Sequence, residues 1–263
     1  GINVSTVLNN LGIANTALGF LAGFTGSEIK RLSADRGIHC DFIFLPEGNN
    51  RINVKLKDYD GTEINGLGPA VPSYKLQELM EQLQKLDSGD TLVLAGSIPS
   101  SLPSDIYQQI MEMLKNKGIQ IVVDATKELL LKCLSFRPFL IKPNKHELEE
   151  IFDATTHTKK EVVHYARLLQ EHGAKNVMVS LSGDGAVFVS ETGEIFEADV
   201  PPGTLINAVG AGDSMIAGFL AGWETSADYK KAFHMAVAAG SASAYSEELA
   251  TQEDVMALLS LIA

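Results

Sequence analysis

The segment from Asn207 to Leu220 combines the residue types that can bind and transfer an anionic group. Gly210 and Gly212 lead into a predicted helix, and Asp213 lies in its first turn. Glycines let backbone N–H groups turn inward, and the positive end of a helix dipole strengthens their field. A carboxylate beside a bound anion is useful if it accepts or orients a proton on an attacking nucleophile. An ordinary glycine turn with Asp213 as a helix-terminal charge fits as well, and spacing alone does not decide between them.

Two common nucleotide-binding signatures are excluded. A G-x-G-x-x-G motif would need glycine at Met215 after the bend, and at Phe188 after Gly183 and Gly185. A phosphate-binding P-loop needs a Gly-Lys pair, and the chain contains none. Any nucleotide must therefore be bound by another arrangement.

A second candidate segment, Lys142-Pro-Asn-Lys-His-Glu147, follows a predicted strand and opens a helix. Lys142 at the carboxyl end of a strand would face the usual ligand crevice of an open α/β sheet. Asn144 and Glu147 are three residues apart on one helical face, which suits oxygen ligands of a hydrated Mg²⁺. Asn144 as a helix N-cap with Glu147 as its capping-box partner needs no ligand, and the sequence alone favours that interpretation.

A third segment, Ser180-Leu-Ser-Gly-Asp-Gly185, connects the predicted strands 177–181 and 186–189. A glycine-rich connection at the end of a strand can lie against nucleotide phosphates or ribose. Such sequences are more often just tight turns. The residues that would border a nucleotide here are Ser180, Ser182, Gly183 and Gly185.

Arg51 and Asn3 complete the candidates. Arg51 begins a predicted strand, and arginine can grip a phosphate with two parallel hydrogen bonds. An isolated arginine on an exposed strand usually serves solubility, so neither residue stands out by itself.

The elements that must position these residues alternate between strands and amphipathic helices. Apolar runs at 91–95, 119–125, 139–142 and 176–181 predict strands. A helix is predicted from about Ser104 to Gly118, and another from the capping box at Thr158 and Glu161 to Gly173. Apolar strands separated by helices indicate an α/β fold with a largely parallel sheet buried on both faces.

Two regions depart from this alternation. Residues 39–69 are predicted to be β-rich, with strands at 41–45, 51–56 and 62–65, and form a candidate lid. At the carboxyl end, three helices follow one another, at about 211–223, 227–246 and 251–262. We therefore predict an α/β core from residues 1–38 and 70–263 with a β-rich lid from residues 39–69.

The composition of the chain argues against several classes of binding partner. The 263 residues carry a net charge of −12, which argues against nucleic acid and anionic lipid as main partners. No run of about 18 apolar residues predicts a membrane span. Cys40 and Cys133 are distant and fit no metal spacing, which favours a reducing, cytoplasmic setting. The chain starts abruptly at Gly1, so we expect that an N-terminal segment precedes it.

Together these segments resemble the ribokinase-like (PfkB) carbohydrate kinases, in particular the branch of 1-phosphofructokinases and tagatose-6-phosphate kinases. The resemblance runs in family order along nearly the whole chain. It is carried by Gly1-Ile-Asn3, Asn50-Arg-Ile-Asn-Val-Lys55, Gly96-Ser-Ile-Pro99, Lys142-Pro-Asn-x-x-Glu147, Ser180-Leu-x-x-x-Gly185 and Gly210-Ala-Gly-Asp213.

The resemblance implies a three-layer sandwich with a small β lid and transfer of the γ-phosphoryl group of ATP to a sugar-phosphate hydroxyl, assisted by Mg²⁺. It implies that Asp213 is the base and that the N–H groups of Ala211 and Gly212 stabilise the transferring group. Lys142 would offset phosphate charge. The remaining implied roles are Mg²⁺ organisation by Asn144 and Glu147, nucleotide contact by Ser180 to Gly185, binding of the substrate phosphate by Arg51, and contact with sugar hydroxyls by Asn3.

Fructose 1-phosphate is the acceptor that we expect, giving fructose 1,6-bisphosphate, with tagatose 6-phosphate as the alternative. A non-catalytic sugar-phosphate sensor on the same fold is a different class, and binding alone would not require Asp213. Strands of the lid in this family often pair between subunits, so a homodimer is a further expectation. The family's first strand and its Gly-Gly-Lys before Gly1 are absent from the sequence.

Overall fold

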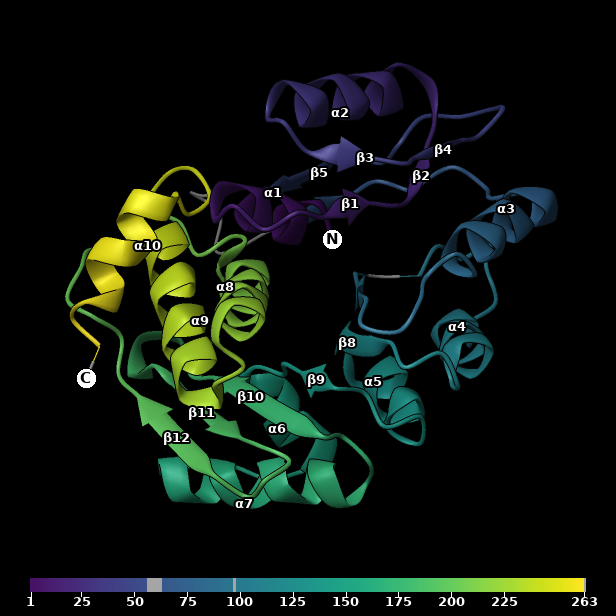
Figure 1. The fold of residues 1–263 in the computed structure, drawn as a ribbon. Helices are drawn as coiled ribbons and strands as arrows, with labels where there is room; N and C mark the ends of the chain where they lie inside the picture. Colours follow the sequence, from purple (N-terminus) through teal and green to yellow (C-terminus); the bar gives the residue numbers. More distant parts are fainter. Residues whose placement is uncertain (56–62, 97, 263) are drawn as a thin grey trace. The chain divides into compact units, whose positions relative to one another are not determined.

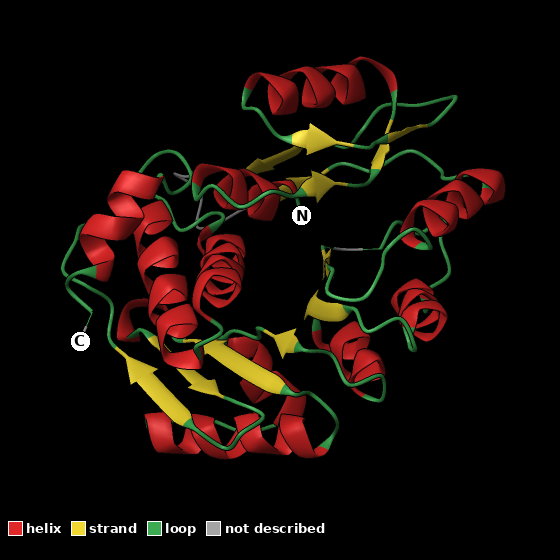
Figure 2. Ribbon diagram, viewed as in Figure 1, coloured by secondary structure: helices red, strands yellow, loops and turns green. Residues whose placement is uncertain are grey.

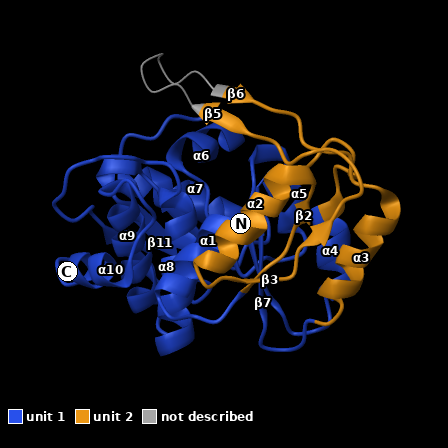
Figure 3. Ribbon diagram, turned by 90° about the horizontal axis from the view of Figure 1, so that it is seen from above, with its two compact units in different colours: residues 1–15, 86–97, 107–263 blue, residues 16–85, 98–106 orange. Residues whose placement is uncertain are grey.

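The computed structural model describes residues 1–55, 63–96 and 98–262. The chain forms two compact units, coloured separately in Figure 3. Unit 1 consists of residues 1–15, 86–97 and 107–263, and unit 2 of residues 16–85 and 98–106. Of the predicted site residues, Arg51 belongs to unit 2 and all the others belong to unit 1.

The middle layer of unit 1 is a six-stranded sheet, visible in Figure 1. Four neighbouring strands are parallel, and two more are added antiparallel at one edge. In spatial order the strands are β12 (Ile195–Ala198), β11 (Ala186–Val189), β10 (Asn176–Ser180), β9 (Leu140–Ile141), β8 (Gln120–Asp124) and β7 (Thr91–Ala95). Every residue of β11 is buried, as expected for a strand covered on both faces. The predicted, mostly parallel sheet is confirmed.

Helices cover both faces of this sheet and give unit 1 three layers (Figure 2). On one face α7 (Lys159–Glu171) packs against β10 and β11, and on the other lie α8 (Ala211–Ser226) and α9 (Tyr229–Ala244). Phe188 of β11 stacks against Phe233 of α9 in the core beneath these two helices. The remaining helices of unit 1 are α1 (Ile2–Asn10), α4 (Ile106–Leu114, from its second residue), α5 (Lys127–Leu134), α6 (Lys145–Phe152) and α10 (Gln252–Leu259). The predicted α/β fold class is confirmed.

The three successive helices predicted at the carboxyl end are α8, α9 and α10, with somewhat different bounds. Ala227 takes a left-handed conformation that ends α8, and the Asp228 side chain caps α9 by accepting the Lys231 N–H at 3.0 Å. α9 starts two residues later than expected as a result. None of the helices in the described residues is long and apolar enough to span a bilayer.

The described residues of unit 2 form three short strand pairs and two helices. β1 (Thr16–Ala17) pairs parallel with β3 (His39–Cys40), and β2 (Phe20–Leu21) pairs parallel with β4 (Ile43–Phe44). β5 (Asn53–Lys55) and β6 (Glu63–Asn65) form an antiparallel ribbon. The helices are α2 (Gly23–Asp35) and α3 (Ser73–Leu83), and the small core contains Ala22, Leu45 and Val71.

The predicted lid of residues 39–69 lies within unit 2 and contains β3 to β6. The predicted strands at 41–45, 51–56 and 62–65 correspond to β4, β5 and β6; β4 is shorter at both ends, and β5 begins two residues later. Leu56 and Thr62 lie outside the described residues. That this segment closes over a site remains a prediction.

Candidate active site

Three polar side chains lie at one edge of the sheet, because the carboxyl ends of its parallel strands meet there. Asp124 ends β8, Lys142 follows β9, and Ser180 ends β10. The Lys142 ammonium is almost fully buried, and its Nζ lies 3.4 Å from Asp124 Oδ1. A buried ammonium needs such a partner, because an unpaired charge is costly to bury. The sequence prediction identified Lys142 and Ser180 but missed Asp124.

The glycine bend lies at the start of α8. Gly210 has φ of 87°, which favours glycine, and a β-carbon there would stand 2.6 Å from Leu249 Cδ2. The Ala211 N–H donates to Ala208 O at 3.2 Å. Over the described ranges, the N–H groups of Gly212 and Asp213 donate to no protein oxygen. Of the two predicted amide donors, Gly212 is therefore free for an anion, whereas Ala211 is bonded.

Asp213 is held by Asn3. Asn3 Nδ2 donates to Asp213 Oδ2 at 2.8 Å, although 210 positions separate the two residues. The Asp213 side chain keeps 23% of its surface exposed, so it remains accessible to a substrate. Packing of α1 against α8 brings the two side chains together. Asn3 was predicted to contact sugar hydroxyls, and its described contact is with the predicted base.

Lys142 lies directly beside the bend. A β-carbon at Gly212 would stand 3.0 Å from Lys142 Nζ. The absence of a side chain at Gly212 thus leaves room for the ammonium next to the unbonded Gly212 N–H. The Lys142 ammonium and the Gly212 N–H can stabilise a transferring anion, while the carboxylate of the next residue, Asp213, receives a proton.

Asn144 and Glu147 form a complete capping box at the start of α6. Asn144 Oδ1 accepts the Glu147 N–H at 2.8 Å, and Glu147 Oε2 accepts the Asn144 N–H at 2.9 Å. The capping interpretation is confirmed, and it leaves Glu147 Oε1 available. Within the described part of the chain, no group of three or more His, Cys, Asp or Glu side chains could hold a metal. A Mg²⁺ ion bound mainly by water and substrate phosphates needs one or two carboxylates, so this pair still fits one.

The predicted nucleotide segment is a tight turn beside Asn144. Ser180 bridges to Asn144 as an extension of the parallel sheet, and residues 182–184 form one turn of 3₁₀ helix. Gly185 has φ of 87°, and a β-carbon there would overlap the Ala198 carbonyl at 1.9 Å. Ser182 and Gly183 are exposed at the tip of the turn, so they are accessible to a ligand.

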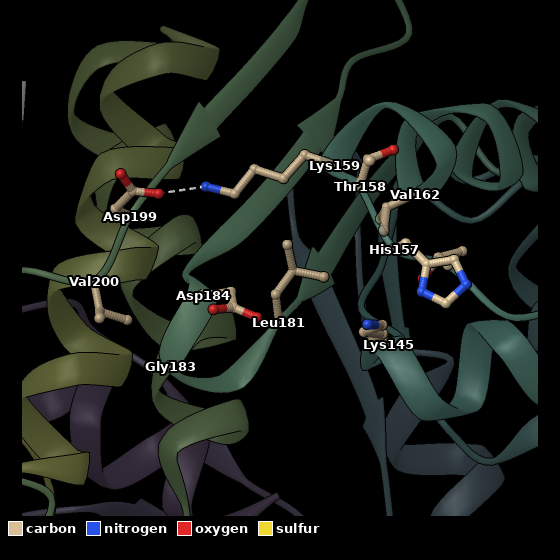
Figure 4. Close-up of a pocket in the computed structure, with 11 residues that line it drawn as sticks. Lys145, His157, Thr158, Lys159, Val162, Leu181, Gly183, Asp184, Asp199 and Val200 are labelled. Carbon is tan, nitrogen blue, oxygen red and sulfur yellow. Dashed lines mark hydrogen bonds and ion pairs between the residues drawn. The ribbon is translucent and has the colours of Figure 1, made fainter.

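A cavity of about 490 Å³ lies on one side of this turn (Figure 4). Leu181, Gly183 and Asp184 border it together with the start of α7. In Figure 4 Lys159 extends toward Asp199, and their ion pair measures 2.5 Å. Both acidic and basic side chains line the cavity, and neither Lys142 nor Asp213 is among them.

Arg51 belongs to unit 2 and is exposed just before β5. Its role in binding a substrate phosphate remains a prediction. The structure therefore brings Asn3, Lys142, Gly212 and Asp213 together within unit 1. It places Asn144 beside Ser180 at the same edge of the sheet.

Comparison with known proteins identifies the family. The pfkB family carbohydrate kinase pattern matches residues 1–255. The 1-phosphofructokinase of Bacillus subtilis is 47% identical over 98% of this chain and 85% of its own length. The D-tagatose-1-phosphate kinase of Bacillus licheniformis is 34% identical over 95% of this chain and 82% of its own length. A crystal structure of phosphofructokinase-2 from Escherichia coli in complex with substrates and products has a TM-score of 0.90 at 27% identity, covering 99% of this chain and 86% of that one. The chain belongs to the pfkB family of carbohydrate kinases.

Proposed function

We propose that this kinase transfers the γ-phosphoryl group of ATP to the free terminal hydroxyl of fructose 1-phosphate. The observation that carries the proposal is the juxtaposition of Asp213, the unbonded Gly212 N–H and the buried Lys142 ammonium. Phosphoryl transfer depends mainly on positioning and charge stabilisation, for which this small set is sufficient. The identity to the 1-phosphofructokinase of Bacillus subtilis supports fructose 1-phosphate as the acceptor.

In the proposed reaction, Asp213 accepts the proton of the attacking hydroxyl, and Asn3 orients the carboxylate through its hydrogen bond. The Gly212 N–H and the Lys142 ammonium stabilise the charge on the transferring group. The N–H of Ala211 would join them only if its bond to Ala208 O opened. Arg51 binds the phosphate already present on the sugar, which favours a phosphorylated acceptor over a neutral one.

The nucleotide and its metal are proposed to lie along the edge formed by Asn144 and Ser180. Glu147 Oε1 and Asn144 would organise Mg²⁺ through water, and the ion when bound would neutralise phosphate charge. Ser180, Ser182, Gly183 and Gly185 would border the nucleotide. The exposed tip of the turn supports this role.

The ribbon of β5 and β6 is proposed to act as the lid and to pair with a second copy of the chain. Ile52, Val54, Ile64 and Leu67, in or beside this ribbon, are all exposed. An isolated two-stranded ribbon is marginally stable in water, so covering these apolar side chains would stabilise it. The two free thiols, Cys40 and Cys133, support a reducing cytoplasmic setting.

The test is a comparison of ADP formation with fructose 1-phosphate, tagatose 1-phosphate, tagatose 6-phosphate and fructose 6-phosphate. We expect the highest kcat/KM with fructose 1-phosphate. A higher value with tagatose 6-phosphate would favour the alternative acceptor expected from the sequence. A higher value with tagatose 1-phosphate would favour the activity named for the relative that is 34% identical. Binding of the sugar phosphates without ADP formation would contradict the proposal and favour a non-catalytic sensor.

A further inference from the structure

Two buried serines connect the glycine bend to the helix behind it. Ser214 in α8 and Ser243 in α9 are almost completely buried, and their Oγ atoms are 2.6 Å apart. Ser214 Oγ donates to Gly210 O at 2.9 Å, and Ser243 Oγ accepts the Ala250 N–H at 2.8 Å. Because the Ser214 hydrogen is committed to a carbonyl, Ser243 supplies the hydrogen between the two hydroxyls. A continuous chain of hydrogen bonds, called the relay below, therefore runs from the Ala250 N–H through the Ser243 and Ser214 hydroxyls to the Gly210 carbonyl.

The relay ends on a backbone carbonyl of the bend, that of Gly210. Gly210 O also accepts the Ser214 N–H at 2.9 Å, which is the first hydrogen bond of α8. The Gly210 carbonyl and the Ala211 N–H belong to one planar trans peptide unit and point in opposite directions. Fixing the carbonyl therefore fixes the first turn of the helix, in which the unbonded Gly212 N–H points out of the N-terminus.

The far end of the relay is anchored as well. Asn10 Nδ2 donates to Ala250 O at 2.9 Å, so both backbone polar groups of Ala250 are bonded to side chains. Asn10 ends α1, the helix whose first turn carries Asn3 and its bond to Asp213. Helix α1 is thus bonded through Asn3 to the Asp213 carboxylate and through Asn10 to Ala250, where the relay begins.

Packing alone does not explain the two hydroxyls. α8 and α9 approach each other closely through glycines: a β-carbon at Gly218 would stand 2.5 Å from Met235 O, and one at Gly222 would stand 2.7 Å from Ala232 Cα. Alanine at position 214 would fill such an interface without bringing in a polar group that must be satisfied, whereas alanine at position 243 would leave the buried Ala250 N–H unpaired. The hydroxyls instead give the Gly210 carbonyl a defined direction.

We propose that Ser214 and Ser243 are positioning residues that hold the Gly210–Asp213 bend in the form that binds the transferring phosphoryl group. This inference rests on the proposed function of the bend. A preorganised donor contributes most where charge develops, so the relay acts on the transition state more than on substrate binding.

The test compares Ser243→Ala and Ser214→Ala with Ser241→Ala, which lies in the same helix, is 5% exposed and is outside the relay. We expect kcat to fall about 10-fold to 100-fold in the two relay variants, as for small displacements of positioned groups. Their KM values should stay within about twofold of wild type, because ground-state binding is retained. Ser241→Ala should match the wild type.

A second measurement addresses the bend directly. The affinity of the protein for ADP is measured by calorimetric titration in the presence of Mg²⁺ and fructose 1-phosphate. The titration is done with and without aluminium fluoride, which imitates the planar transferring group. We expect wild type and Ser241→Ala to bind ADP more tightly when aluminium fluoride is present. In the two relay variants this gain in affinity should be about 10-fold smaller. A merely structural role would lower the unfolding midpoint and leave the gain unchanged in the folded protein.

The outcomes separate the relay from the proposed function. Ser214→Ala leaves the Ser243–Ala250 bond in place, so it tests the relay even if Ser243→Ala does not fold. Wild-type kcat and an undiminished aluminium fluoride gain in Ser214→Ala would overturn the positioning role. Absence of turnover and of any gain in the wild type would overturn the proposed function, and the inference with it.

Discussion

Gly212 at the start of α8 lies next to Lys142 at the edge of the sheet, and Lys142 leaves little room for a side chain at position 212. A β-carbon on Gly212 would lie 3.0 Å from Lys142 Nζ and 3.5 Å from Cε. The ammonium in turn lies 3.4 Å from Asp124 Oδ1. One residue without a side chain therefore allows a buried cation to stand beside a free backbone donor.

The first prediction concerns this space. Gly212→Ala should lower kcat by about 10-fold to 100-fold by displacing the ammonium. Lys142 Nζ is the far end of a long side chain and must move by only a few tenths of an ångström, so the free energy of unfolding should change by less than about 1 kcal/mol. Gly218→Ala is the matched control in the same helix: its β-carbon would meet Met235 O at 2.5 Å, so it should lower stability instead. Rates and urea midpoints for both variants separate the effects, and a normal kcat in folded Gly212→Ala would contradict the assignment.

Glu147→Gln tests the proposed metal role without disturbing the helix. Glutamine can replace glutamate in a capping box, so the unfolding free energy should change by less than about 0.5 kcal/mol. Loss of the charge should raise the Mg²⁺ concentration for half-maximal rate by about 10-fold, which is about 1.4 kcal/mol. Glu161→Gln is a matched control, because Thr158 and Glu161 form a capping box of the same kind at the start of α7. Identical Mg²⁺ curves for both variants would leave Glu147 as a capping residue.

Arg51→Ala tests the proposed phosphate contact. Removing a charged hydrogen-bond donor should raise KM for the sugar phosphate by about 10-fold to 100-fold and leave KM for ATP within about twofold. Arg31→Ala is the control, since Arg31 is also exposed in unit 2 but is paired with Glu28 and Asp35. Equal increases in both KM values would reassign Arg51 to the nucleotide or to the fold.

Acid sensitivity is predicted at Glu149. Its Oε1 accepts the Thr156 N–H at 2.7 Å and the Thr156 hydroxyl at 2.8 Å, and these bonds lower the pKa of Glu149. A carboxyl with a lowered folded pKa stabilises the protein above its unfolded pKa, and the contribution is lost as the pH falls through the folded pKa. Glu149→Gln should therefore have a lower urea midpoint than wild type at neutral pH, and the difference should shrink below pH 4.5. Glu150→Gln, on the exposed side of α6, should track the wild type; a constant deficit at every pH would contradict the prediction.

Local patterns predicted most of the framework. Apolar runs located β7 to β11, and the capping box at Thr158 and Glu161 located the start of α7, because strand burial and helix capping depend on residues that are near in sequence. The box at Asn144 and Glu147 was recognised for the same reason.

Contacts between distant residues were not predictable in this way. Asp124 is an unremarkable aspartate after an apolar run until the register of β8 and β9 brings it to Lys142. The Asn3–Asp213 bond and the Ser214–Ser243 relay depend on how α1, α8 and α9 pack. An aspartate at the carboxyl end of a predicted parallel strand was the one available signal for Asp124, since such ends share an edge.

The role of Asp213 as the base is tested most directly by the rate of phosphoryl transfer in Asp213→Asn, measured together with the affinity of this variant for ATP. The substitution keeps the size of the side chain and an acceptor for Asn3 Nδ2, but removes the base. Loss of the base should lower kcat with fructose 1-phosphate by about 10²-fold to 10⁴-fold, while the calorimetric Kd for ATP stays within about twofold. Turnover close to that of the wild type would contradict this role of Asp213.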